Sequence, residues 1–247
     1  MSTRVWTILL GLVAYLVFLV TGAPADRIAG WLAARVPGLA VEQPAGTLSS
    51  GSAPALHLGA LHLGETRWHW RPQVLPLGRL ELAAEVFSGD FVGRLAVGGG
   101  LDGPYLRAVR GSLEIAALAR ALGLPESGGG RLLLDLDEVR PREDGAWELA
   151  GAATWVEARI DRPVAIALGE VRLDLEPTAT GTQARLSAPE DGPLWLQGTL
   201  DLEAGTWRLR ARLGPGPGAG ENLRRALALL GRPDADGRVA IRYDGKL

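Results

Sequence analysis

The chain has 247 residues, which is enough to bury a sizeable hydrophobic core in one large or two small domains. Its 26 basic and 28 acidic residues leave a formal net charge of −2, so charge gives no basis for binding nucleic acid. The absence of cysteine excludes disulfides, thiolate metal sites and cysteine catalysis.

The N-terminal part of the chain contains a run without charged residues, residues 5–25. At about 1.5 Å per residue, a helix of this length spans roughly 30 Å, the thickness of the hydrocarbon core of a bilayer. Arg4 precedes the run, and positive charge stays on the cytoplasmic side of such a segment. We therefore predict a cytoplasmic stub over residues 1–4 and a single transmembrane helix, a signal anchor, over residues 5–25.

A cleaved signal peptide is the alternative interpretation of this run. Ala23-Pro24-Ala25 has the small-x-small form of a cleavage site. The apolar run is longer than the usual core of a signal peptide, and this length favours the anchor. Both interpretations place residues 26–247 outside the cytosol.

A short helix is expected directly after the uncharged run. Pro24 suits the start of a helix, and Ile28, Leu32 and Arg35 follow at helical spacing. Pro37-Gly38 ends it. We predict this helix over residues 24–36.

The dominant pattern beyond residue 41 is the alternation of apolar and polar residues. A period of two is typical of a strand with one buried face and one wet face. The clearest runs cover residues 80–86, 132–137, 171–176, 194–203, 207–213 and 238–243. Gly, Pro or Asp-Gly sequences bound these runs, which indicates tight turns. The pattern predicts a mainly β domain, with a long curved antiparallel sheet that is wet on one side.

Two Leu- and Ala-rich segments interrupt the alternation, residues 112–124 and 221–231, and both are predicted to be short helices packed on the sheet. Each follows a set of strands and precedes another strand. The two segments are about 110 residues apart, and this layout suggests an internal duplication.

No catalytic, cofactor-binding or metal-binding residue is assigned from the sequence. His57 and His62 alternate with Leu, which predicts exposed positions on short strands, and a metal site needs more convergent ligands. The acid pairs Asp135/Asp137 and Asp174/Glu176 fit the polar half of ordinary strand alternation. No phosphate loop or nucleophile elbow is found either. We therefore do not expect an enzyme, and an exported hydrolase is the least favoured class.

A set of motifs in a fixed order resembles the N component of the type II secretion system (the GspN family). The motifs are an anchor that ends at Pro24, a helix that leads to Pro37-Gly38-Leu39, the element Gly46-Thr47-Leu48-Ser49-Ser50-Gly51, the element Trp70-Arg71-Pro72, and the closing segments Leu229-Leu230-Gly231-Arg232-Pro233 and Tyr243-Asp244-Gly245-Lys246-Leu247. The order and spacing make the match specific. One departure is Ser49, because that position is usually aromatic in the family.

The resemblance implies a single-pass protein of the cell inner membrane with a cytoplasmic N-terminus and a periplasmic β-rich domain over residues 26–247. It implies an accessory, non-catalytic role in type II protein secretion. The implied partners are the inner-membrane C component and, directly or through it, the outer-membrane secretin. No catalytic residue is carried over.

A groove that binds or transfers lipid is the alternative function. A long curved sheet with one apolar face can hold acyl chains, and Leu-rich inner faces are expected of a closed core and of an open trough alike. A continuous apolar cavity would favour lipid binding, and a packed core would favour an interaction scaffold.

Overall fold

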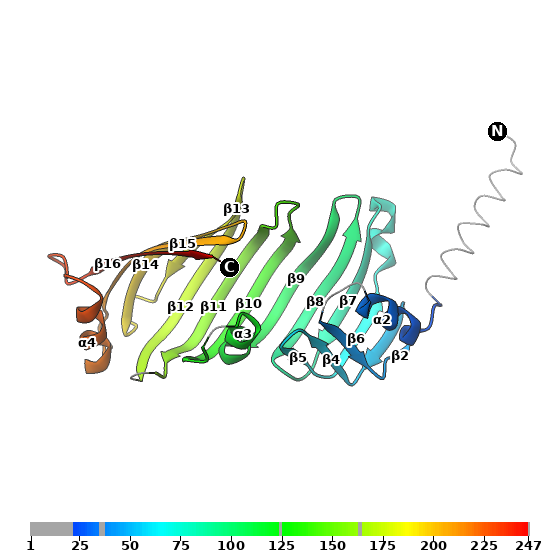
Figure 1. The fold of residues 1–247 in the computed structure, drawn as a ribbon, viewed down its shortest axis with the longest axis horizontal. Coiled ribbons are helices and arrows are strands. Elements are labelled where there is room, and N and C mark those ends of the chain that lie inside the picture. The colour runs from blue at the N-terminus through cyan, green and yellow to red at the C-terminus, as the bar shows by residue number, and fades with distance from the viewer. Residues whose placement is uncertain (1–21, 35–37, 124, 163–164, 247) are drawn as a thin grey trace, which may run out of the picture.

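A computed structural model describes residues 22–34, 38–123, 125–162 and 165–246 of the protein. These residues form one 13-stranded antiparallel sheet and one 3-stranded sheet (Figure 1). The order of the large sheet is β16-β15-β14-β13-β12-β11-β10-β9-β8-β7-β6-β3-β2, so most neighbours in space are also neighbours in the chain. This meander agrees with the tight turns predicted between alternating runs.

The bounds of the elements are as follows. The large sheet contains β2 (Ala45–Gly46), β3 (Ser50–Ala53), β6 (Thr66–Trp70), β7 (Leu80–Val86), β8 (Phe91–Gly100), β9 (Gly103–Glu114), β10 (Gly128–Pro141), β11 (Trp147–Ile160), β12 (Ile166–Thr178), β13 (Gly181–Ser187), β14 (Leu194–Glu203), β15 (Thr206–Pro215) and β16 (Val239–Lys246). The small sheet contains β1 (Leu39–Glu42), β4 (Ala55–Leu58) and β5 (Leu61–Leu63). The helices are α2 (Ala25–Ala33), α3 (Ile115–Ala121), α4 (Glu221–Leu230) and the 3-10 helix η1 (Pro72–Leu77).

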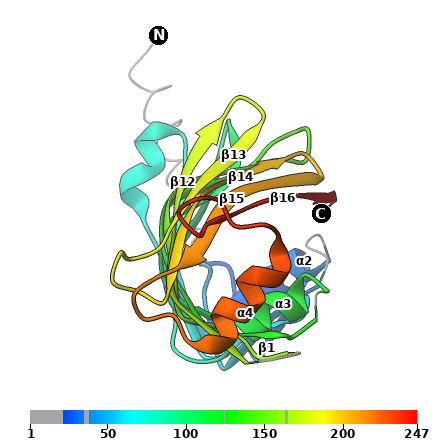
Figure 2. The same ribbon diagram turned by 90° about the vertical axis from the view of Figure 1, so that its left-hand side faces the viewer.

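Viewed along its long axis, the large sheet is curved, and α2, α3 and α4 lie on its concave side (Figure 2). The alternation explains this arrangement, because each strand turns its apolar side chains towards the helices and its charged side chains outwards. On β15, for example, Ala211 belongs to the core while Arg210 and Arg212 are exposed. The prediction of a mainly β fold with a long antiparallel sheet and a few helices is confirmed.

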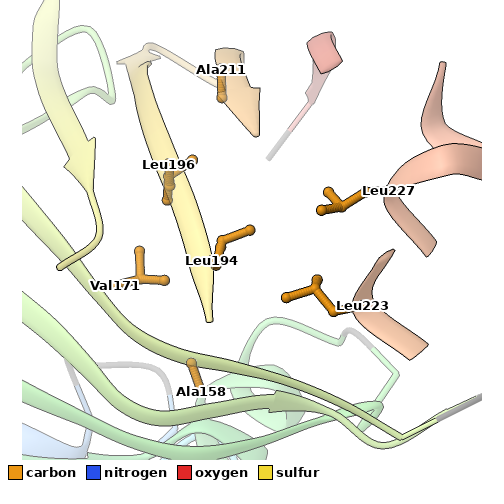
Figure 3. Close-up of a cluster of buried hydrophobic side chains, with 7 residues drawn as sticks. All are labelled: Ala158, Val171, Leu194, Leu196, Ala211, Leu223 and Leu227. Atoms are coloured by element: carbon orange, nitrogen blue, oxygen red, sulfur yellow. The ribbon is translucent and has the colours of Figure 1, made fainter. Parts of the chain in front are cut away.

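Two hydrophobic clusters occupy the concave face. The C-terminal cluster packs Leu223 and Leu227 of α4 against β11, β12, β14 and β15 (Figure 3). Its seven buried members are Ala158, Val171, Leu194, Leu196, Ala211, Leu223 and Leu227. The N-terminal cluster is built around Val86, Phe91, Val109, Leu113, Leu136 and Val139. Leu118 of α3 packs against it.

The boundary of one predicted helix is wrong. Residues Ser112, Leu113 and Glu114 belong to the end of β9, and α3 begins only at Ile115. Leu113 explains the error, because its place on the inner face of a strand also fits the spacing of a helix. The second predicted helix agrees with α4, and the predicted helix at residues 24–36 agrees with α2 within the described residues.

The predicted membrane helix, residues 5–25, falls almost wholly outside the described residues and stays a prediction. Of its described end, Pro24 forms a bridge to Thr47 and Ala25 opens α2. In the described part of the chain, no helix has both the length and the apolar character needed to span a membrane.

Candidate functional site

The concave face carries both hydrophobic clusters, and its two sides differ. The side where α3 and α4 lie is packed, as the two clusters show. Towards the hairpin turns at the other side, apolar side chains of the same face are uncovered. These are Leu80, Val97, Trp147 and Tyr243, which are 57%, 43%, 52% and 50% exposed. We call these four residues the open strip.

The pairing between β11 and β12 stops before it reaches Trp147, the open-strip residue of β11. The ladder between these strands ends at Gly151 and Leu175. Beyond that point the backbone of β11 is hydrogen-bonded by Thr182 of β13. The Thr182 hydroxyl donates to the Trp147 carbonyl (2.7 Å) and accepts from the Leu149 amide (2.9 Å). Thr182 is 1% exposed, and its hydroxyl satisfies one backbone donor and one backbone acceptor of β11.

The motif Gly46 to Gly51 forms the N-terminal end of the large sheet. It makes the hairpin between β2 and β3, and the Trp68 indole donates to the Thr47 carbonyl at 3.1 Å. A Cβ on Gly51 would lie 2.5 Å from the Trp68 ring, so only glycine fits beneath the indole. Ser49, where the resemblance leads us to expect an aromatic residue, hydrogen-bonds the Thr47 hydroxyl at 2.9 Å.

This hairpin also anchors the N-terminal segment of the chain. Pro24 forms a bridge with Thr47, and the Leu48 amide donates to the Ala23 carbonyl at 2.9 Å. The start of α2 is therefore fixed to the end of the sheet. The uncharged run that precedes α2 leads into this end of the molecule.

The C-terminal end of the sheet is the strand β16, which pairs only with β15 among the described strands. It is built like the other end, because the Trp207 ring lies over Gly245 and a Cβ there would come within 2.7 Å of the indole. Val239 is 2% exposed and Tyr243 is half exposed. The far backbone edge of β16 can pair with a further strand.

A buried carboxylate lies on the outer face, where the alternation predicts an exposed one. Glu81 is 5% exposed; it accepts hydrogen bonds from Arg71 (3.1 Å) and from the Tyr105 hydroxyl (3.3 Å). Burial and then the negative charge of Glu81 raise the pKa of Tyr105 above its ordinary value. These contacts join β7 and β9 to the segment before η1, so the cluster is structural.

The residues weighed for chemistry do not form a catalytic arrangement. Asp135 pairs with Arg110 (2.8 Å), Asp174 pairs with Arg172 (2.9 Å), and Glu176 pairs with Arg185. His62 is exposed, as predicted, and His69 is exposed as well. His57 is half exposed and lies directly opposite His62 in the pairing of β4 with β5. The sequence contained a signal for this pair, the repeated Leu-His-Leu-Gly.

Comparison with known proteins supports one family. A model of the family described as "Type II secretion system (T2SS), protein N" matches residues 37–242. Type II secretion system protein N of Vibrio cholerae serotype O1 (strain ATCC 39315 / El Tor Inaba N16961) is 28% identical over 213 residues, which cover 82% of each chain. The protein of the same name from Aeromonas hydrophila is 27% identical over 262 residues and the full length of both chains. No solved structure matches.

The family model covers most of the sequence, and the chain therefore belongs to the family of type II secretion system protein N.

Proposed function

We propose that the protein is an accessory, non-catalytic component of the type II secretion system, held in the inner membrane by the part of the uncharged run that precedes Ala23, with its β-domain in the periplasm. Family membership over residues 37–242 carries this proposal. The length of the run and its lack of charge support the anchor. Its described end, Ala23 and Pro24, pairs with the β2–β3 hairpin, so the anchor would be joined directly to the β-domain. The partners proposed are the inner-membrane C component and, directly or through it, the outer-membrane secretin.

The shape of the domain suits an interaction role. The C-terminal end of the large sheet, β16, offers a backbone edge, and an exposed edge can accept a strand from another protein. The outer face carries ion pairs such as Arg110–Asp135 and Arg172–Asp174, which are exposed and contribute little to stability. Such a face is available for polar contacts with partners.

Crosslinking in cells tests the proposed partners. The full-length protein would be crosslinked in cells with an intact secretion system, purified from membranes and analysed by mass spectrometry. We expect peptides of the C component and of the secretin. Recovery of neither, from cells in which those two components crosslink to each other, would contradict the proposal. N-terminal sequencing of the membrane-bound protein tests the anchor separately, because a chain that starts near Asp26 has lost it.

Lipid binding is the second candidate, and the open strip favours it. Leu80, Val97, Trp147 and Tyr243 give the concave face an uncovered apolar margin, and exposed apolar surface of this kind marks binding sites. The occupant would be the acyl chain of a membrane lipid. A hollow of about 690 Å³ over β12 to β14 does not serve this purpose, because its lining includes Glu176, Arg185 and other polar side chains.

Bound lipid can be measured in the purified full-length protein. We expect phospholipid to co-purify, and Trp147→Glu to reduce its amount because a charge then faces the acyl chain. Arg172→Glu, on the outer face, is the matched control and should leave the amount unchanged. Equal lipid content in the wild type and in Trp147→Glu would remove this candidate and leave the interaction role standing.

A further inference from the structure

His57 and His62 form a close pair on the small sheet, next to a carboxylate. The two residues lie directly opposite each other on β4 and β5. Their Nδ1 atoms are 3.2 Å apart. The other ring nitrogen of His57, Nε2, is 3.2 Å from the Oε1 atom of Glu42, which lies on the neighbouring strand β1.

The carboxylate determines which nitrogen of His57 carries a proton. An ionised Glu42 can only accept, so Nε2 of His57 must donate to it. In the neutral imidazole, Nδ1 of His57 then holds a lone pair, and this lone pair faces His62. A histidine that donates to a carboxylate from one nitrogen and keeps a lone pair on the other is the usual arrangement of a metal ligand.

The spacing of the two Nδ1 atoms also fits a metal ion. Zinc lies about 2.0–2.1 Å from a histidine nitrogen. A distance of 3.2 Å between the two nitrogens then gives an angle at the metal of about 100°, between the octahedral and tetrahedral values. When the ion binds, His62 carries its proton on Nε2, which faces away from the ion, and the charge of both rings is unchanged.

We propose that His57 and His62 bind a divalent late transition metal ion, such as Zn²⁺ or Cu²⁺, through their Nδ1 atoms, with Glu42 orienting His57. Imidazole nitrogen suits these ions, and Cu²⁺ binds more tightly than Zn²⁺ at a given set of ligands. Within the described residues, no group of three or more His, Cys, Asp or Glu side chains is placed to hold a metal. The site therefore has two protein ligands, and water fills the remaining positions.

The ion would fasten the small sheet, which covers the N-terminal cluster. It would link β4 to β5 directly and β1 through Glu42, so that all three strands of the small sheet are tied together. The other face of this sheet contributes Leu61 and Leu63 to the N-terminal cluster. Asp90 already holds β5, because it accepts from the His62 amide at 2.8 Å and pairs with Arg120 at 3.6 Å.

Calorimetric titration of the purified full-length protein with ZnCl₂ tests the site, after treatment with a chelator and above the ordinary imidazole pKa of about 6.5. We expect one ion per chain and tighter binding of Cu²⁺ in a parallel titration. Either His57→Ala or His62→Ala should lower the affinity at least tenfold. Glu42→Gln should lower it about tenfold to a hundredfold, which is typical for a residue that orients a ligand.

His69 provides the control, because the sequence has only three histidines and no cysteine. It is exposed on β6 and takes no part in the pair, so His69→Ala should bind Zn²⁺ as the wild type does. Circular dichroism establishes that each variant is folded, and His62→Gln replaces His62→Ala if the latter is not. An absence of binding by the wild type up to millimolar Zn²⁺ would overturn the proposal. So would an equal loss of affinity in His69→Ala.

Discussion

The two helical connections of the large sheet, β9–α3–β10 and β15–α4–β16, have the same layout but different surroundings. In each, a helix leaves one strand, packs on the concave face and returns to the neighbouring antiparallel strand. The returning strand β10 is paired on both sides, with β9 and β11, whereas β16 is paired with β15 alone. The helices also differ in how much apolar surface they bury. Of the side chains of α3, only that of Ala117 is buried, whereas α4 buries Leu223 and Leu227. The unit with fewer strand partners thus relies more on its helix.

The largest expected effect tests how far the C-terminal unit depends on its last strand. Deletion of residues 236–247 removes Val239, which is 2% exposed, and uncovers the edge of β15. Apolar burial of roughly 1.5–3 kcal/mol per large side chain is lost, against a typical domain stability of about 5–15 kcal/mol. We expect a truncated protein that is proteolysed or insoluble when expressed in the envelope. Normal accumulation with wild-type protease resistance would mean that β16 is peripheral.

The two helices can be compared directly by shortening one leucine in each. Leu223→Ala in α4 leaves a cavity at a site that is 3% exposed, and we expect a loss of about 3 kcal/mol. Leu118→Ala in α3 affects a half-buried side chain and should cost about 1 kcal/mol. Leu229→Ala, at a position that is 88% exposed, is the control and should cost less than about 0.5 kcal/mol. Denaturant titration measures all three, and equal values for Leu223 and Leu118 would contradict the comparison.

The two ends of the sheet offer a finer test, because each has a glycine beneath a tryptophan. A Cβ on Gly51 would lie 2.5 Å from both the Trp68 ring and the Ala45 carbonyl oxygen, and backbone cannot easily move. The three atoms nearest to a Cβ on Gly245 all belong to the Trp207 ring, the first at 2.7 Å. We expect Gly51→Ala to cost about 2–3 kcal/mol and Gly245→Ala about 1 kcal/mol. Thermal unfolding of the two variants gives the order, and the reverse order would show that β16 is the more rigid end.

Most of the strands could be predicted from the sequence because one face is buried and the other is wet. The runs at residues 194–203 and 207–213 lie within β14 and β15, where Leu196 and Ala211 are buried and the charged residues between them point outwards. Turn residues then set the order of the meander. The end of β9 is predicted as helix instead of strand, because Leu113 fits both the period of two of a strand and the period of 3.6 of a helix.

Features that depend on contacts between distant segments could not be predicted. Glu81 follows the polar half of its strand, yet it is buried because Tyr105 and Arg71 fold against it. The pairing of His57 with His62 depends on the register of β4 and β5, which the repeated Leu-His-Leu-Gly suggests but does not define. The open strip likewise follows from where α3 and α4 end on the sheet, which alternation does not encode.

The smallest effect is a pH dependence confined to the N-terminal half, where Glu81 is the one buried acid of the described residues. Burial and the negative charge of Glu81 raise the pKa of Tyr105, so the folded state holds the phenolic proton more tightly than the unfolded state does. The resulting stability is complete below the ordinary tyrosine pKa of about 10 and is lost as the pH rises through the higher pKa of the folded state. Tyr105→Phe should remove this alkaline loss and cost about 1 kcal/mol at neutral pH for the lost hydrogen bond to Glu81. Denaturant titrations at neutral and alkaline pH give the difference in unfolding free energy between the wild type and Tyr105→Phe. Ionisable groups that the two proteins share contribute equally to both, so their effects cancel in this difference. A difference that does not change with pH would mean that the Tyr105 hydroxyl titrates as freely in the folded chain as in the unfolded one, and that the buried cluster does not restrain it.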